Sequence, residues 1–109
     1  MSVTFAKGFK AGSVAAGLKS SGKLDVTVIQ NLGPKDDAAA VFTSNRAKAN
    51  PVLWSMEAIK DCAARAVVLN SGGANCYTGA QGFQTTHKSA ELVADALHLS
   101  AQDLSLIHI

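Results

Sequence analysis

The sequence predicts an α+β fold, in which short strands come first and a helix–strand–helix unit follows. Two observations predict it. β-branched runs bounded by Gly and Pro turn signals occupy residues 12–43. Two segments with helical spacing of apolar residues then enclose one short apolar run at residues 65–70. Strands followed by such a unit favour a layered α+β domain, and 109 residues suffice for one domain or part of one.

Three short strands are expected in the first part of the chain, at residues 12–18, 24–30 and 38–43. The second has the clearest pattern, because residues 24–29 are β-branched and partly alternating. Ser20-Ser21-Gly22-Lys23 predicts a hairpin-like turn before it, and Gly33-Pro34 marks the break after it. Consecutive antiparallel pairing is the simplest arrangement of these three strands.

The first helix is expected to begin at Asn50-Pro51, since Asn is a favoured N-cap and Pro is favoured at the first helical position. Glu57 and Lys60 are expected on its exposed face. The apolar face is predicted to consist of Val52, Trp54-Ser55-Met56 and Ile59. After it, residues 65–70 contain the continuous apolar run 66–69, which is typical of a strand buried on both faces.

The second helix is expected from Thr78 to about His98. Thr78 and Gln81 have the spacing of a capping box, with Thr as N-cap. The apolar positions that recur at helical spacing are Phe83, Ala90, Val93, Ala94 and Leu97.

Charge and composition exclude several classes of protein. Ten basic against eight acidic side chains leave a net charge of +2, which disfavours a dedicated nucleic-acid binder. No apolar run approaches the roughly 18 to 20 residues of a membrane-spanning helix, and the N-terminus does not resemble a secretory signal. Cys62 and Cys76 have no CxxC spacing. A reduced, cytoplasmic location without a disulfide framework is therefore expected.

The loop Ser71-Gly72-Gly73-Ala74-Asn75-Cys76-Tyr77 is the most informative local feature. Consecutive glycines can turn N–H groups inward, and the following helix start adds free donors, which predicts an oxyanion or carboxylate site. The structural interpretation is a tight turn with positive φ at glycine, in which Asn70 and Asn75 satisfy loop backbone. The residues favour the structural interpretation without excluding the other. Neither a P-loop nor GxGxxG is present, so nucleotide binding is disfavoured.

Other candidate chemistry is weaker. Ser71 is not in a GxSxG context, because Leu69 stands where Gly is needed. Cys76 with His87 as base lacks a third group to orient the imidazole, so a structural cysteine is favoured. The three histidines lack metal-ligand spacing. The basic residues of the first half predict a solvated face, or secondarily the attraction of an anionic small substrate: Lys7, Lys10, Lys19, Lys23, Lys35, Arg46 and Lys48.

Several short motifs follow one another along the chain. They are Gly8-Phe9-Lys10-Ala11, Val14-Ala15-Ala16-Gly17-Leu18-Lys19, Ala40-Val41-Phe42-Thr43-Ser44-Asn45, Ala49-Asn50-Pro51-Val52, Val67-Val68-Leu69-Asn70-Ser71-Gly72-Gly73-Ala74-Asn75, Thr78-Gly79 and Gly82-Phe83. Together they resemble the start of the ornithine acetyltransferase/glutamate N-acetyltransferase family, the ArgJ family. The similarity covers about residue 4 to Asp103, and the NSGxAN…TG block is its most characteristic stretch.

The resemblance implies the N-terminal part of a layered αββα-type sandwich (DmpA/ArgJ-like), incomplete in this chain. It implies a multifunctional N-acetyltransferase of arginine biosynthesis, which moves acetyl from N-acetylornithine to glutamate. Some members also use acetyl-CoA as donor. The precursor cleaves itself before an internal Thr, which then carries the acetyl group. No metal or tightly bound cofactor is implied. The partner is the β chain of the same precursor, in an α2β2 assembly without nucleic acid or membrane.

The sequence also departs from the family. The oxyanion Thr-Gly pair is expected soon after Asp103 and the cleavage Thr much further on, and neither is present. Thr78-Gly79 is a different pair, and Thr85 and Thr86 lie mid-helix. The chain is therefore assigned no catalytic residue and no metal ligand, and its substrate-binding residues stay unassigned, including the loop 71–75. The fragment alone is expected to be inactive.

The last six residues, Leu104-Ser105-Leu106-Ile107-His108-Ile109, are also the translation of a widely used transposon sequencing adapter. We expect residues 1–103 to form the N-terminal part of the acetyltransferase α chain and residues 104–109 to be a non-native tail. Two alternatives remain. One is a small non-enzymatic anion-binding or oligomerisation module built on the Gly72-Gly73 loop. The other is an Ntn-like peptidase or amidase, against which the NSGGAN and ANPV motifs weigh.

Overall fold

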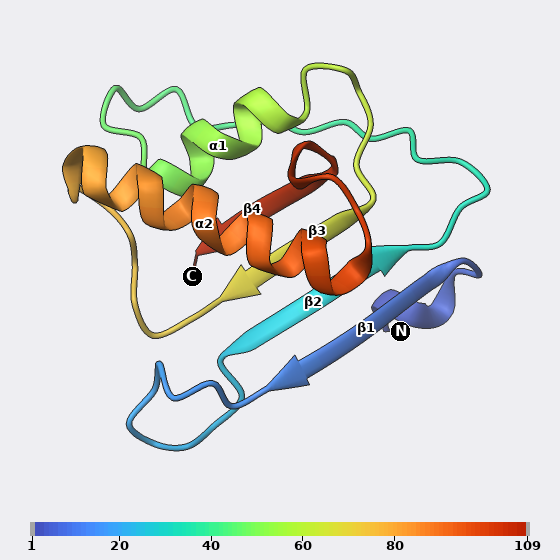
Figure 1. Ribbon diagram of the computed structural model, residues 1–109, viewed down its shortest axis with the longest axis horizontal. Helices are drawn as coiled ribbons and strands as arrows, with labels where there is room; N and C mark the ends of the chain where they lie inside the picture. Colours follow the sequence, from blue (N-terminus) through green and yellow to red (C-terminus); the bar gives the residue numbers. More distant parts are fainter. Residues whose placement is uncertain (1, 109) are drawn as a thin grey trace.

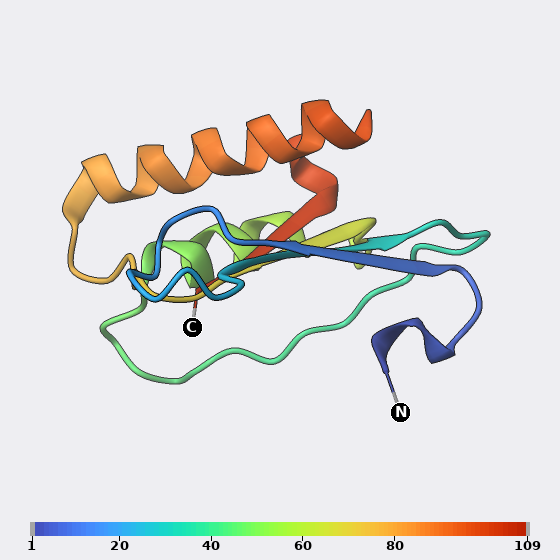
Figure 2. The ribbon, with the colours of Figure 1, turned by 90° about the horizontal axis from the view of Figure 1, so that it is seen from below.

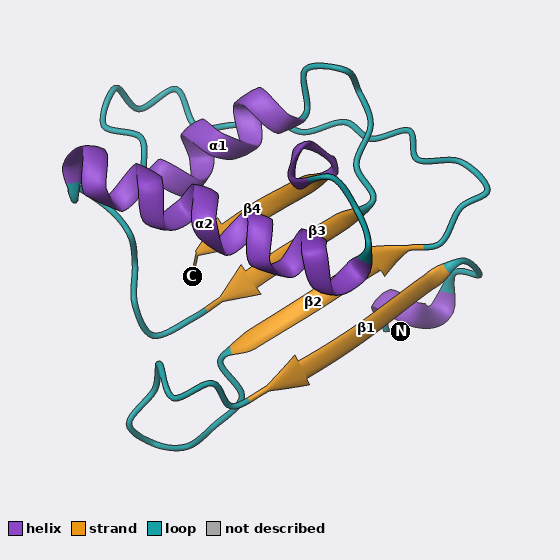
Figure 3. Cartoon of the chain, in the orientation of Figure 1, coloured by secondary structure: helices purple, strands orange, loops and turns teal. Residues whose placement is uncertain are grey.

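The computed structural model describes residues 2–108 and consists of a four-stranded sheet with one helix across a face and another along one edge (Figures 1 and 3). The strand order is β1-β2-β3-β4, antiparallel except for the parallel pair β3 and β4. The predicted α+β class is confirmed. The elements are η1 (Val3–Phe5), β1 (Phe9–Val14), β2 (Val26–Asn31), α1 (Asn50–Ala58), β3 (Ala66–Asn70), α2 (Gly79–Leu97), η2 (Ala101–Asp103) and β4 (Leu104–His108).

The first two predicted strands are confirmed as an antiparallel pair, with Val14 opposite Val26. The first strand lies earlier than expected, at Phe9–Val14. The third predicted strand, at residues 38–43, is wrong, because these residues form an irregular connection in which Val41 is 99% exposed. The free edge of β2 pairs with β3 instead, so the middle of the sheet joins segments far apart in the sequence.

Helix α1 lies along the outer edge of β4. The indole Nε1 of Trp54 donates to the Leu104 carbonyl at 3.0 Å. The Ser55 hydroxyl donates to the Leu106 carbonyl at 2.9 Å and accepts from the Leu106 N–H at 3.1 Å. These bonds occupy backbone groups that an edge strand otherwise leaves unpaired. Helix α1 therefore covers the β4 edge of the sheet and prevents another strand from pairing there.

The beginning of α1 corrects one detail of the sequence analysis. The helix starts at Asn50 with Pro51 in its first turn, but Ala49 is the N-cap and makes no side-chain capping bond. The Asn50 side chain points instead toward the loop after β3, where it donates to Thr78 Oγ1 at 2.9 Å. The predicted exposed pair, Glu57 and Lys60, forms an ion pair at 2.6 Å.

Helix α2 packs on the sheet through small residues. Gly82, Thr86, Ala90 and Ala94 are its buried positions, spaced four residues apart. Small side chains on this stripe let the helix approach the sheet closely. Phe83, predicted for the apolar face, is 36% exposed, and its ring lies 6.4 Å from that of Trp54 between centroids. The buried core consists of Ala66, Val68, Ala90, Ala94, Leu104 and Leu106.

Strand β3 is buried on one face only. Ala66 and Val68 face the helices and are 2% and 6% exposed, whereas Val67 and Leu69 on the other face are half-buried. Figure 2 shows α2 covering one side of the sheet, while the connection before α1 runs on the opposite side. The prediction that this strand is buried on both faces is therefore confirmed for one face only. A second sheet, as an αββα sandwich requires, is not present in residues 2–108.

The segment predicted to be a non-native tail pairs with β3 as β4. Leu104 and Leu106 are 0% and 4% exposed and belong to the core. The foreign origin of these residues stays a prediction. Residue 109 lies outside the described residues. Within residues 2–108, neither helix has the length and apolar character needed to cross a membrane.

Candidate functional site at the loop after strand β3

The turn after β3 requires a glycine at position 72. Gly72 has a φ of +104°, in the region that favours glycine. A Cβ at this position would lie 2.8 Å from Lys19 Cγ and 3.2 Å from the Leu18 carbonyl oxygen. The loop 71–78 therefore packs directly against the connection between β1 and β2. Gly73 has no such requirement, since its Cβ would meet nothing within 4 Å.

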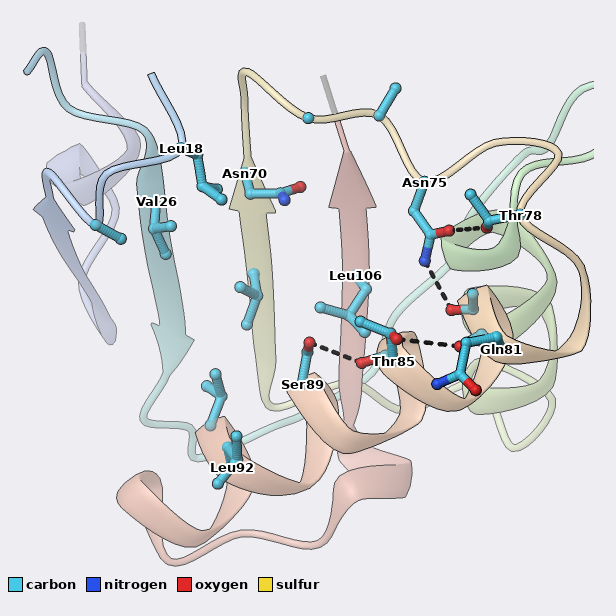
Figure 4. Close-up of a pocket in the computed structure, with 16 residues that line it drawn as sticks. Leu18, Val26, Asn70, Asn75, Thr78, Gln81, Thr85, Ser89, Leu92 and Leu106 are labelled. Atoms are coloured by element: carbon cyan, nitrogen blue, oxygen red, sulfur yellow. Dashed lines mark hydrogen bonds between the residues drawn. The ribbon is translucent and has the colours of Figure 1, made fainter. Parts of the chain in front are cut away.

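Asn75 ties the loop to both helices. Its Nδ2 donates to the Gly82 carbonyl at 2.7 Å and to Thr86 Oγ1 at 2.9 Å. Its Oδ1 accepts from Asn50 Nδ2 at 3.2 Å and from the Thr78 hydroxyl. Figure 4 shows this side chain directed at the beginning of α2. These contacts fit the structural interpretation of the loop, with one change: Asn75 satisfies helix backbone rather than loop backbone.

The predicted capping box does not form. Thr78 is the N-cap of α2 by position, but its side chain makes no capping bond to the helix backbone. Its hydroxyl joins Asn75 and Asn50 instead. Space for this polar cluster depends on Gly82, because a Cβ there would overlap Thr78 Oγ1 and lie 2.5 Å from both Asn50 Nδ2 and Asn75 Oδ1.

Asp25 is a structural residue that the sequence analysis did not single out. The residue is 4% exposed, and its carboxylate accepts backbone N–H bonds from Ala16 at 2.6 Å, Leu18 at 2.6 Å and Lys19 at 3.0 Å. These bonds, the one from Ala16 most of all, hold the pKa of Asp25 below its ordinary value of 3.8, although burial opposes the shift. The available signal was an acidic residue at the head of a β-branched run.

A cavity of about 720 Å³ lies between the loop 71–78, the sheet and α2. It falls in the size range of small-molecule pockets. Among residues 2–106, whose side chains the structure describes, its lining contains no Asp, Glu, Lys, Arg or His. Asn70, expected to satisfy loop backbone, lines it, and the Asn70 Oδ1 is buried without a hydrogen-bond partner among the side chains that the structure describes, those of residues 2–106. Figure 4 shows Asn70 and Leu106 on the sheet side, with Gln81, Thr85, Ser89 and Leu92 on the helix side.

The remaining candidates do not form a catalytic arrangement. The His87 ring lies over Trp54 at 4.9 Å between centroids, and its Nε2 is 3.5 Å from Glu91 Oε1. Cys76 is half-buried with a free thiol. The Ser71 backbone N–H donates to the Asp25 carbonyl at 2.8 Å. Within the described part of the chain, no group of three or more His, Cys, Asp or Glu is placed to hold a metal ion.

Comparison with known proteins gives consistent matches along the chain. Residues 10–108 match the ArgJ family. The chain is 54% identical over 106 residues to "Arginine biosynthesis bifunctional protein ArgJ" of Streptomyces coelicolor, covering 97% of this chain and 28% of that protein. It is 58% identical over 101 residues to the protein of the same name from Thermobifida fusca, covering 93% of this chain and 26% of that protein. The chain thus spans little more than a quarter of the length of these relatives.

Solved structures agree with these matches. The fold is similar to that of ornithine acetyltransferase from Mycobacterium tuberculosis, solved in complex with ornithine, with a TM-score of 0.95 and 46% identity over 98% of this chain and 58% of that chain. The ArgJ protein from Bacillus halodurans gives a TM-score of 0.91 at 30% identity, over 99% of this chain and 56% of that chain. The backbone arrangement around the loop after β3 is therefore shared with proteins of known structure.

Proposed function

Since the chain belongs to the ArgJ family, we propose that it is the N-terminal part of a bifunctional glutamate N-acetyltransferase and ornithine acetyltransferase of arginine biosynthesis. The observation that carries this proposal is the match over residues 10–108, together with a fold that superposes on ornithine acetyltransferase with a TM-score of 0.95. The longer protein would then supply the reacting groups.

The proposed reaction transfers an acetyl group through a covalent intermediate. The hydroxyl of a Thr freed by self-cleavage attacks the acetyl carbonyl of N-acetylornithine, and ornithine leaves as the amine. The amino group of glutamate then attacks the acetyl-Thr ester, forming N-acetylglutamate and restoring the hydroxyl. A Thr-Gly pair stabilises the oxyanion. This Thr and this pair belong to the longer polypeptide, and none of residues 1–109 is assigned a catalytic role.

The contribution of this chain is a scaffold. Gly72, Asn75 and Asp25 fix two neighbouring loops at one end of the sheet. Members of the family need no tightly bound cofactor, and acetyl-CoA serves some of them as a second acetyl donor. The proposed partner is the β chain of the same precursor in an α2β2 assembly. The proposed location is the reduced cytoplasm, as expected for a chain whose two cysteines lack the spacing of a disulfide framework.

The alternative of a stand-alone anion-binding module on the Gly72-Gly73 loop has less support. The Asn75 amide and carbonyl are already occupied within the protein, and the described residues that line the adjoining cavity are uncharged. A desolvated anion needs a paired cation or several free donors. A titration of the chain with phosphate and acetate tests this alternative directly.

Complementation tests the proposed function. The 109-residue chain is co-expressed with the part of the M. tuberculosis relative that follows the matched region, and transfer of labelled acetyl from N-acetylornithine to glutamate is measured. The relative's own N-terminal segment, expressed in the same split form, is the matched control. We expect acetyl transfer by the pair and none by the chain alone. A stable complex without transfer, beside an active control, would refute the proposal. If the two parts fail to associate, a single fused chain gives the same readout.

A further inference from the structure

The connection between β1 and β2 surrounds one carboxylate with backbone donors. Asp25 Oδ1 accepts the Ala16 N–H at 2.6 Å, and Oδ2 accepts the N–H groups of Leu18 at 2.6 Å and Lys19 at 3.0 Å. Gly17, between these donors, has a φ of +88°. A left-handed residue within a turn directs successive N–H groups to one side, as in the backbone nests that bind anions. The connection therefore has the geometry of an anion-binding nest.

Backbone donors alone hold this charge within the part of the chain whose side chains are described, residues 2–106. Asp25 is 4% exposed, and no ion pair there joins its carboxylate to a lysine or an arginine. A buried charge is costly unless it is paired or hydrogen-bonded, so the three N–H groups take the place of a cation. The residues above the carboxylate, Ala16, Gly17 and Leu18, are exposed, which leaves the nest close to solvent.

The backbone of Asp25 joins the nest to two other segments. Its N–H donates to the Val14 carbonyl at the end of β1 at 3.1 Å, and its carbonyl accepts the Ser71 N–H at 2.8 Å. The connection after β1 and the loop after β3 lie at the same end of the sheet (Figure 1). Residue 25 is thus bonded to both of them.

The loop 71–78 packs on the residues that form the nest. A Cβ at Gly72 would lie 3.2 Å from the Leu18 carbonyl oxygen and 2.8 Å from Lys19 Cγ. The loop therefore keeps its position only while Leu18 and Lys19 keep theirs. The hydrogen bonds of the carboxylate within residues 2–106 all go to the nest, so any effect of the carboxylate on the loop passes through these two residues.

We propose that the N–H groups of Ala16, Leu18 and Lys19 form a carboxylate-binding site, which Asp25 fills in the folded chain, and that a carboxylate in this site fixes the loop 71–78. The ligand class is a small monocarboxylate, because the donors are divided between the two oxygens of one group. A monatomic anion such as chloride has no second acceptor atom for this arrangement. The inference goes beyond the proposed function and does not rest on it, since every group involved lies in this chain.

Chemical rescue tests the site. Asp25→Ala is prepared in the 109-residue chain, and amide hydrogen exchange is measured at pH 7 in sodium chloride and in sodium formate of equal ionic strength. In chloride, we expect the Leu18 and Ser71 amides to exchange at least about tenfold faster than in the parent chain. Formate should slow both toward the parent rates. Asp36→Ala is the matched control, because the Asp36 side chain is 49% exposed and lies 3.6 Å from Arg65 Nε.

Formate should leave exchange unchanged in Asp36→Ala and in the parent chain, where Asp25 already fills the nest. It should also have no effect in Asp25→Asn, because the amide group occupies the same space. A response to formate in any of these three chains would overturn the proposal, since it would show that formate acts elsewhere.

Two results in Asp25→Ala would also overturn the proposal. Equal exchange of the Leu18 amide in formate and in chloride, with the sheet still protected, would show that the nest does not bind a carboxylate. Faster exchange at Leu18 with an unchanged rate at Ser71 would show that the loop 71–78 is held independently. If Asp25→Ala does not fold in chloride, recovery of amide protection in β2 and β3 on adding formate provides the readout, and its absence would refute the site.

Discussion

Replacing Gly82 by Ala is expected to destabilise α2, although the substitution improves helix propensity. Gly82 is a buried position inside the helix. Alanine is favoured over glycine in a helix interior by about 1 kcal/mol. Local propensity alone therefore predicts a gain in stability from Gly82→Ala, and the tertiary contacts predict the opposite.

The magnitude follows from the polar cluster above this position. A Cβ on residue 82 would overlap Thr78 Oγ1 and lie 2.5 Å from Asn50 Nδ2 and Asn75 Oδ1. Three hydrogen bonds join these groups, so all three must lengthen or break to make room. At about 1 kcal/mol net for each bond, the loss is about 3 kcal/mol, which leaves a net destabilisation of about 2 kcal/mol after the propensity gain.

Amide hydrogen exchange of the α2 backbone is the suitable assay, since it reports local opening without requiring cooperative global unfolding. A loss of about 2 kcal/mol corresponds to roughly 30-fold faster exchange. Gly12→Ala is the control, because a Cβ at that position meets nothing within 4 Å, and α2 exchange should not change. Slower α2 exchange in Gly82→Ala than in the parent chain would refute this account of the cluster.

Three further predictions follow from other parts of the structure. Asp25→Asn should speed hydrogen exchange of the Ala16 and Leu18 amides at pH 7. The difference from the parent chain should shrink below about pH 4, because a carboxylate with a lowered pKa stabilises the fold only while it is charged. A difference in exchange rate that does not depend on pH would contradict this prediction. Ser55→Ala should lower the stability of the β4 edge by about 1 to 3 kcal/mol, because it leaves buried backbone groups of Leu106 unpaired. The Leu106 amide should then exchange faster. An unchanged exchange rate would show that α1 does not protect the edge of β4. The chain alone should unfold without a cooperative thermal transition and should aggregate, given its exposed apolar face, so a sharp calorimetric peak would count against incomplete packing.

The predicted foreign origin of residues 104–109 is settled by DNA rather than by protein chemistry. We expect resequencing across the Asp103 codon, from a library made without the adapter, to show a frame that continues into a Thr-Gly pair and later a cleavage Thr. The same codons for residues 104–109 in adapter-free genomic DNA would show that β4 is native, and the burial of Leu104 and Leu106 would then be a property of the natural protein.

The local pattern of apolar and turn residues predicted the structure correctly wherever that structure depends on residues close together in the sequence. The apolar periods placed both helices and the strands at Val26–Asn31 and Ala66–Asn70, and Pro51 marked the first turn of α1. The ordered motifs also identified the family, because runs such as NSGGAN are specific as sequence. These features depend on backbone preferences and side-chain alternation, which a short window contains.

The local sequence pattern did not predict contacts between segments that are far apart in the chain. Residues 38–43 have strand-like composition, but β3 takes the edge of β2 because it pairs with β4 and carries the helix-facing core. Asn50 has the composition of an N-cap, yet its side chain bonds to Thr78, 28 residues away. In each case a buried polar group or strand edge is satisfied by whichever partner the tertiary fold brings within reach.

The sequence by itself determined the α+β class, the helix positions and the family of this protein. Only the tertiary structure decided which strand completes β2, why position 82 must lack a side chain, and that Asn70 lines a cavity. The physical reason is that periodicity and propensity act within a few residues, whereas strand pairing, steric clearance and hydrogen-bond satisfaction depend on groups that meet only after the chain has folded.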